Sequence, residues 1–171
     1  MHVFLTGEKG VGKSRTAAAA VALLGLPCVG FRTAFQTEDR HASSLYLLPA
    51  GEQDQRTEAH VAAVWRDGKL TEADDAFDTW GAELLREARQ HPKALILMDE
   101  CGHAEKNALT FQNEIKACLD GGIPVLGVLR KGQAWHEMIR RHPRVQVLEV
   151  TLENRERLPR EIAALLRGKE P

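Results

Sequence analysis

The sequence predicts an α/β fold in which helices cover both faces of a mostly parallel β-sheet, giving three layers. Short apolar runs alternate with segments of helical periodicity along most of the 171 residues, and this alternation is typical of parallel sheets. The run Ala94–Met98 (ALILM) is apolar at every position, as expected for a central strand that is buried on both faces. A glycine-rich turn at residues 7–12 separates the first apolar run from the first helical segment.

Hydrophobic periodicity and stop signals define the expected elements. A strand at His2–Thr6 precedes a helix at Lys13–Leu24, which Gly25 and Pro27 end. The expected later strands are 28–32, 43–48, 94–98, 124–129 and 145–150, and the expected later helices are 74–90, 108–119, 134–141 and 155–166. Residues 52–69 carry many charges and only a weak pattern, so we expect an irregular or mixed insertion there.

Composition and charge narrow the class of protein. With 43% hydrophobic and 27% charged residues, the chain is typical of a soluble globular protein, and its length fits a single domain over residues 1–171. The formal net charge is −1, and no concentrated run of Lys or Arg indicates a nucleic-acid or membrane surface. The N-terminus lacks the pattern of a signal peptide. We therefore expect a cytoplasmic monomer that binds neither nucleic acid nor membranes, with no partner protein indicated.

The segment GEKGVGKS at residues 7–14 matches the P-loop pattern G-x-x-x-x-G-K-[ST]. Its glycines permit a tight turn whose backbone N–H groups bind phosphate oxygens at the N-terminus of a helix. In this pattern Lys13 contacts the β- and γ-phosphates of a nucleoside triphosphate, and the Ser14 hydroxyl binds Mg²⁺. The predicted phosphate-binding residues are Gly7, Glu8, Lys9, Gly10, Val11, Gly12, Lys13, Ser14 and Arg15.

Charged residues follow two of the expected strands. Asp99 and Glu100 come directly after ALILM, where we expect Asp99 to hold Mg²⁺ through water and Glu100 to polarise an attacking water. Arg130 follows the strand at 124–129 and is a candidate cation for the transferred phosphate. The predicted catalytic residues are thus Lys13, Glu100 and Arg130. A simple alternative stays open for the strand-end residues, because charged side chains often end buried strands where they meet solvent.

Four motifs occur in a characteristic order. They are the P-loop, GFRT at residues 30–33, MDECG at 98–102 and TLENR at 151–155. In this order and spacing the chain resembles the small P-loop nucleoside-triphosphatase family, known from thermophiles and also called cancer-related nucleoside-triphosphatases. The resemblance covers nearly the whole chain, and the variable region 34–75 is the least similar part.

This resemblance implies a RecA-like α/β sheet with an antiparallel hairpin inserted after the second strand. It also implies slow, Mg²⁺-dependent hydrolysis of ATP, GTP and other triphosphates to diphosphate and phosphate, with loose base preference. Asn154 and Arg155 become candidates for contacts with the base, although an N-cap role for Asn154 is an equal alternative. The family commonly reads Asp-Glu-Ile-Gly-Lys-Met-Glu where residues 99–105 read DECGHAE, so His103 replaces a lysine.

Two other functions use the same phosphate cradle. A nucleotide or small-molecule kinase would pass the γ-phosphoryl group to an acceptor hydroxyl, and such enzymes usually carry an Arg-rich lid that excludes water. Residues 50–70 contain only Arg56 and Arg66 as arginines. A nucleotide-binding switch with little turnover is the second alternative, in which residues 34–75 would change conformation between nucleotide states.

Overall fold

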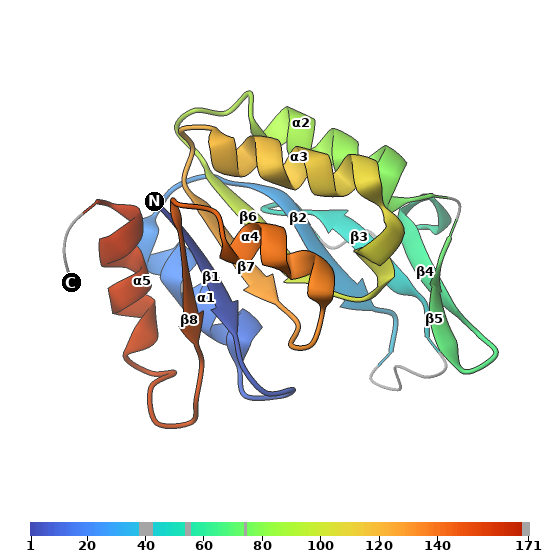
Figure 1. The fold of residues 1–171 in the computed structure, drawn as a ribbon, viewed down its shortest axis with the longest axis horizontal. Helices are drawn as coiled ribbons and strands as arrows, with labels where there is room; N and C mark the ends of the chain where they lie inside the picture. The colour runs from blue at the N-terminus through green and yellow to red at the C-terminus, as the bar shows by residue number, and fades with distance from the viewer. Residues whose placement is uncertain (38–42, 54–55, 74, 169–171) are drawn as a thin grey trace.

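The computed structural model describes residues 1–37, 43–53, 56–73 and 75–168, and its strands form one eight-stranded sheet with helices on both faces (Figure 1). The strand order across the sheet is β5-β4-β3-β2-β6-β7-β1-β8. The strands are β1 (His2–Thr6), β2 (Cys28–Phe35), β3 (Leu45–Pro49), β4 (Val61–Arg66), β5 (Lys69–Glu72), β6 (Leu95–Cys101), β7 (Val125–Leu129) and β8 (Val145–Glu149). The helices are α1 (Lys13–Leu24), α2 (Ala82–Ala88), α3 (Leu109–Asp120), α4 (Glu137–Arg140) and α5 (Leu158–Leu166).

The sheet has a parallel part and an antiparallel part. Strands β2, β6, β7, β1 and β8 pair in parallel, whereas β3, β4 and β5 continue from β2 as antiparallel neighbours. The predicted α/β class and the antiparallel hairpin after the second strand are therefore confirmed. Because the five parallel strands point the same way, their carboxyl ends lie along one edge of the sheet.

Two hydrophobic cores lie on opposite faces of the sheet. On one face, side chains of β1 and β7 pack against α1 and α5, with Ala17, Ala20 and Ile162 buried among them. On the other face, α2 and α3 pack over β2, β6 and β7, and Phe31, Phe77 and Phe111 form the centre of this core. Among the described residues, no helix has the length and apolar composition needed to cross a bilayer.

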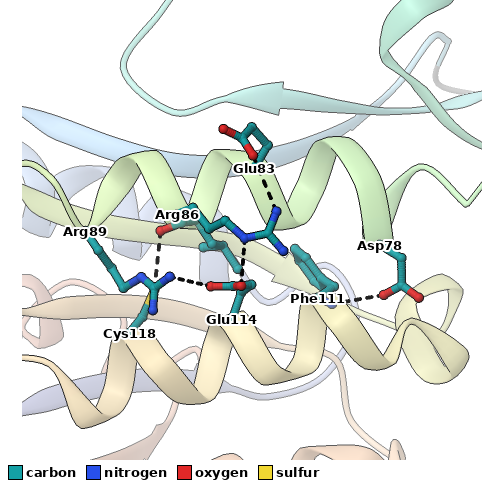
Figure 2. A network of polar contacts seen from close by, with 8 residues as sticks. Asp78, Glu83, Arg86, Arg89, Phe111, Glu114 and Cys118 are labelled. Atoms are coloured by element: carbon teal, nitrogen blue, oxygen red, sulfur yellow. Dashed lines mark hydrogen bonds and ion pairs between the residues drawn. The ribbon is translucent and has the colours of Figure 1, made fainter.

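Polar contacts join α2 to α3 on the outer surface of the second core (Figure 2). Glu114 of α3 accepts a hydrogen bond from Arg86 of α2 at 2.8 Å and another from Arg89, the C-cap residue of α2, at 2.5 Å. The carboxylate of Asp78 accepts a hydrogen bond from the backbone N–H of Phe111 at 2.9 Å. This N–H lies in the first turn of α3, where helices leave donors without an intrahelical partner, so Asp78 caps α3 from outside it.

Residues 52–69, for which we expected an irregular or mixed insertion, contain regular structure in their described part. This segment holds a 3₁₀ turn at Glu58–His60, strand β4 and the beginning of β5. Asp67 and Gly68, both with positive φ (50° and 73°), form the turn between the two strands. β5 is the edge strand and β4 lies next to it; β4 buries the adjacent residues Ala62 and Ala63, so it lacks the alternation that identifies a strand.

The predicted helix at 74–90 is shorter and begins irregularly; residue 74 lies outside the described residues. A wider, π-helical turn at Phe77–Gly81 precedes α2. The carboxylate of Glu72 accepts a hydrogen bond from the N–H of Phe77 at 3.0 Å, which caps the start of this turn. The predicted helix at 134–141 is likewise divided into a 3₁₀ turn at Ala134–His136 and the short α4.

Gly127 of β7 faces Phe4 of β1 across the parallel pair, and it allows the two strands to pack closely. A Cβ atom at Gly127 would lie 2.1 Å from the Phe4 ring. We therefore expect Gly127→Ala to lower the free energy of unfolding by about 1–3 kcal/mol, because overpacking forces neighbouring side chains off their preferred positions. Gly122→Ala is the matched control, since a Cβ there meets no atom within 4 Å. Equal urea-unfolding midpoints for the two variants would contradict this account.

Candidate active site

The predicted phosphate-binding turn connects β1 to α1 at the carboxyl edge of the sheet. Gly7 has a φ of 147°, and a Cβ there would lie 2.6 Å from the carbonyl oxygen of Val150. Gly12, with a φ of 106°, occupies the N-cap position of α1. Both conformations favour glycine, and the first turn of α1 presents backbone N–H groups that have no intrahelical partner. The loop therefore has the geometry of an anion site at a helix N-terminus.

Lys13 lies under this loop with 8% of its surface exposed. Its Nζ donates hydrogen bonds to the carbonyl oxygens of Gly7 at 3.1 Å and Glu8 at 3.0 Å. The ammonium group is thus held against the loop by backbone acceptors. Lys13 lines a cavity of about 350 Å³, which we call the phosphate cavity. The other lining residues are 7–10, Gly12, Ser14, Arg15, Glu100, Arg130 and Lys131. The sequence prediction placed all of these residues except Lys131 in the phosphate site.

Ser14 and Asp99 are 85 positions apart in the chain and lie in contact at the N-terminus of α1. The Ser14 hydroxyl donates a hydrogen bond to Oδ1 of Asp99 at 2.9 Å. The pKa of Asp99 is raised from 3.8 to about 6, chiefly by burial; the nearby Glu100 charge also raises it, whereas the Ser14 hydrogen bond lowers it. A buried carboxylate that is costly to ionise is one that a nearby cation would stabilise.

These oxygen atoms fit the chemistry of Mg²⁺. Mg²⁺ prefers oxygen ligands and keeps several waters, so protein sites commonly supply only one or two side chains and the substrate phosphates supply the rest. Among the described residues, no cluster of three or more His, Cys, Asp or Glu side chains could hold a metal by itself. The Ser14 hydroxyl and the Asp99 carboxylate would hold the ion in the way expected for a nucleotide-bound Mg²⁺.

Glu100 lies on the wall between two cavities. It lines the phosphate cavity and also a neighbouring cavity of about 610 Å³, which Thr33, Arg56 and Asp99 help to form. The backbone N–H of Glu100 donates a hydrogen bond to Thr33 Oγ1 at 3.2 Å, which ties β6 to β2 at this edge. Thr33 follows Arg32 in the GFRT motif, and this contact gives that motif a structural role.

Arg130 and Lys131 follow β7 and both line the phosphate cavity. The Arg130 backbone N–H donates to the carbonyl oxygen of Cys101 at 3.0 Å, which fixes the start of this loop beside β6. Lys131 bridges two carboxylates, with Nζ 2.7 Å from Oε1 of Glu8 and 2.7 Å from Oε1 of Glu149. No pattern in the sequence indicates this bridge, because it joins three segments that only the fold brings together.

Asn154 holds the loop between β8 and α5. Its Oδ1 accepts a hydrogen bond from the Thr151 N–H at 2.8 Å, and its Nδ2 donates to the Glu149 carbonyl at 2.8 Å. The side chain therefore satisfies the backbone of its own loop, while α5 begins only at Leu158 rather than at 155. The alternative that Asn154 is the N-cap of α5 is wrong, since Arg157 occupies that position.

Arg155 lies beside the phosphate-binding turn, where its Cδ is 3.9 Å from a Cβ built on Gly12. It lines a cavity of about 420 Å³ between α1 and α5, together with Arg15, Ala19 and Arg160. This cavity adjoins the phosphate cavity, because Gly12 and Arg15 line both. Of the two predicted base contacts, Arg155 thus lines a cavity next to the phosphate cavity. Asn154 instead holds the loop in which Arg155 lies.

Several known proteins are similar to this chain in sequence and in fold. The family model described as NTPase matches residues 2–163. The chain is 30% identical over 170 residues to nucleoside-triphosphatase THEP1 of Methanosarcina barkeri, covering 95% of each chain. It is also 30% identical over 184 residues to the cancer-related nucleoside-triphosphatase homolog of Mus musculus, covering 98% of this chain and 97% of that one.

Two solved structures have similar folds. The crystal structure of THEP1 from Aquifex aeolicus gives a TM-score of 0.74 at 23% identity, covering 97% of this chain and 99% of that one. The solution structure of a human cancer-related nucleoside triphosphatase gives a TM-score of 0.69 at 26% identity, covering 99% of both chains.

Replacing Asp99 with Asn tests the cost of burying this carboxylate. The amide keeps an oxygen that accepts the Ser14 hydrogen bond but removes the charge. Since the fold raises the pKa of Asp99 from 3.8 to about 6, the stability that its protonated form contributes is complete below pH 3.8 and is lost as the pH rises through 6. We expect Asp99→Asn to raise the free energy of unfolding of the nucleotide-free protein by about 1–3 kcal/mol near pH 8.

The same comparison near pH 4 should show little difference between the two proteins, because Asp99 is then protonated in the folded state. Urea unfolding at both pH values, without nucleotide or Mg²⁺, makes the measurement. A variant that is less stable than the native chain near pH 8 would contradict the proposed cost.

Proposed function

The chain belongs to the nucleoside-triphosphatase family, and we propose that it hydrolyses nucleoside triphosphates, ATP and GTP among them, to diphosphate and phosphate with Mg²⁺. The observation that carries this proposal is the position of Glu100. Its side chain lines the cavity formed by the phosphate-binding turn, and Lys13 and Ser14 line the same cavity. A general base beside a phosphate cradle is the arrangement that hydrolysis by water requires.

Binding begins with the phosphates. The N–H groups of the turn and of the first turn of α1 donate to phosphate oxygens, and Lys13 supplies a positive charge beside the β- and γ-phosphates. Ser14 and Asp99 would hold Mg²⁺. The bound ion would supply positive charge that stabilises the triphosphate and the leaving diphosphate.

Hydrolysis then needs a water placed in line with the γ-phosphate. Glu100 accepts a hydrogen bond from this water and takes its proton as the water oxygen bonds to the γ-phosphorus. The bond from that phosphorus to the β–γ bridging oxygen breaks, and the diphosphate leaves with the electron pair. Arg130 stabilises the charge on the transferred group. The products are a nucleoside diphosphate, inorganic phosphate and a proton.

Base preference is loose in this proposal, because the phosphates receive most of the fixed contacts. The cavity between α1 and α5 holds the base, with Arg155 and the aliphatic wall around Ala19 as its contacts. Asn154 contributes by shaping the loop before α5 rather than by reading the base, since its amide already bonds Thr151 and Glu149.

A kinase is the second candidate, and the cavity of about 610 Å³ beside Glu100 is the observation that favours it. This space adjoins Ser14 and Asp99 and is large enough for a small acceptor molecule, whereas hydrolysis needs room only for water. Its polar lining by Thr33, Gln36 and Thr37 suits an acceptor that carries hydroxyl groups. Dependence of turnover on an added acceptor distinguishes the two reactions.

Phosphate release from ATP, GTP, CTP and UTP with Mg²⁺ tests the proposed hydrolysis. We expect release without any acceptor. Lys13→Ala should lower kcat by about 100-fold or more, because it removes a charged donor to the phosphates. Glu100→Gln should lower kcat by about 100- to 10,000-fold with little change in nucleotide affinity, since it removes only the proton acceptor.

Tight nucleotide binding without phosphate release in the native chain would overturn the hydrolase proposal. It would leave a kinase that lacks its acceptor or a nucleotide-dependent switch. Full activity in Glu100→Gln would instead remove Glu100 from the mechanism while leaving the hydrolase in place.

Arg130 and Lys131 allow a paired test of the catalytic cation. Among the described residues, Lys131 has two carboxylate partners and the Arg130 guanidinium has no ion pair. Arg130 can therefore engage the γ-phosphate without breaking existing contacts. We expect Arg130→Ala to lower kcat by about 100-fold or more and Lys131→Ala to lower it by less than about tenfold. The reverse order in single-turnover rates would assign the role to Lys131.

A further inference from the structure

We propose that Glu105 is a positioning residue whose buried carboxyl group fixes the turn after β6 and thereby the approach of Glu100 and Arg130 to the γ-phosphate. This inference rests on the proposed hydrolysis, and it gives a function to a side chain that lines none of the cavities described above. Glu105 lies in a 3₁₀ turn at Ala104–Asn107, directly after β6.

The carboxyl group of Glu105 contacts the backbone of this turn. Its Oε2 accepts a hydrogen bond from the Gly102 N–H at 2.9 Å. A Cβ built on Gly102 would lie 3.5 Å from that oxygen and 3.9 Å from Cδ of Arg130. Glu105 and the Arg130 side chain thus flank Gly102, two residues after Glu100.

Two further hydrogen bonds hold the same short segment. The Trp135 indole Nε1 donates to the Gly102 carbonyl at 2.9 Å, and the Arg130 N–H donates to the Cys101 carbonyl at 3.0 Å. The loop after β7 and the loop after β6 are therefore joined at residues 101 and 102. Glu105 supplies the acceptor for the Gly102 N–H, which would otherwise be buried without a partner.

Burial distinguishes Glu105 from an ordinary surface carboxylate. It is 1% exposed, and carboxyl groups are almost never fully buried unless they have a specific partner. An apolar side chain could fill the same space, but it would leave the buried Gly102 N–H without a hydrogen-bond acceptor, which destabilises the folded state. The carboxyl group therefore stabilises the turn by accepting the Gly102 hydrogen bond, a role that an apolar side chain of similar volume could not take.

The charged surroundings of Glu105 are mostly acidic. The pKa of Glu105 is raised to about 7, chiefly by burial; the charges of Glu100 on β6 and Glu72 on β5 also raise it, whereas its backbone hydrogen bonds lower it. Cys101 also lies close, and the Glu105 charge contributes to raising the pKa of that buried thiol. Near neutral pH the Glu105 carboxyl group therefore exists in both protonation states.

Two substitutions separate the hydrogen bond from the charge. Glu105→Gln keeps an oxygen that accepts from Gly102, whereas Glu105→Ala removes the acceptor. We expect Glu105→Gln to retain kcat within about threefold near pH 8. We expect Glu105→Ala to lower kcat by about 10- to 100-fold, because displacing a catalytic group by up to about 1 Å has effects of this size. Affinity for a non-hydrolysable triphosphate analogue should change by less than about threefold in both.

The matched control is Glu114→Ala, which removes another largely buried carboxylate, in this case from the ion pairs between α2 and α3. It should lower stability without lowering kcat below the native value at a temperature where all variants are folded. Equal kcat losses in Glu105→Ala and Glu114→Ala, or a loss of analogue affinity that parallels kcat, would overturn the positioning role.

A second readout does not depend on activity. In an NMR pH titration, the amide of Gly102 should shift with an apparent pKa near 7 in the native chain and lose this transition in Glu105→Gln. A native chain that releases no phosphate would overturn the hydrolase, and the Gly102 titration would then still test the contact. Loss of the transition in Glu105→Gln supports the inference, and an unchanged Gly102 titration overturns it.

Discussion

The parallel alignment of β6, β7 and β1 is the constraint on which the site depends. Each strand ends at the same edge of the sheet, so the residues that follow each strand become neighbours although they lie far apart in the chain. The phosphate-binding turn follows β1, Glu100 is near the end of β6, and Arg130 follows β7. The tight packing of Phe4 against Gly127 keeps β1 and β7 in register. A shift in this pairing would separate Lys13 from Glu100 and Arg130.

Much of this arrangement could be predicted from the sequence, because local signals specify it. The P-loop pattern requires glycine at fixed positions, and the structure has Gly7 and Gly12 at positive φ. The helix at Lys13–Leu24 has the predicted bounds, since Gly25 ends it in the left-handed conformation. The apolar run before Asp99 identified the central strand, and β6 extends it to Cys101 because that residue is also fully buried.

The contacts that pattern reasoning missed are those that depend on tertiary structure. Strand β4 buries two adjacent alanines instead of alternating positions, and the edge strand β5 has only four residues. The Lys131 bridge to Glu8 and Glu149 joins positions up to 123 residues apart, and no spacing in the sequence indicates it. The motif DECGHAE assigned no role to Glu105, and its burial and its contact with Gly102 are visible only in the fold.

Three carboxyl groups within seven residues give the active-site edge its electrostatic character. Asp99 and Glu105 are both buried enough to have raised pKa values, and Glu100 between them raises each further. Such crowding destabilises the nucleotide-free protein above neutral pH, because the folded state prefers some of these groups protonated. The charge of Lys13 offsets this repulsion at Asp99, and the hydrogen bond from Gly102 offsets it at Glu105. Under the proposed function, a cation bound at Asp99 would offset the repulsion further, so that binding of Mg²⁺ with the nucleotide would stabilise this edge of the sheet.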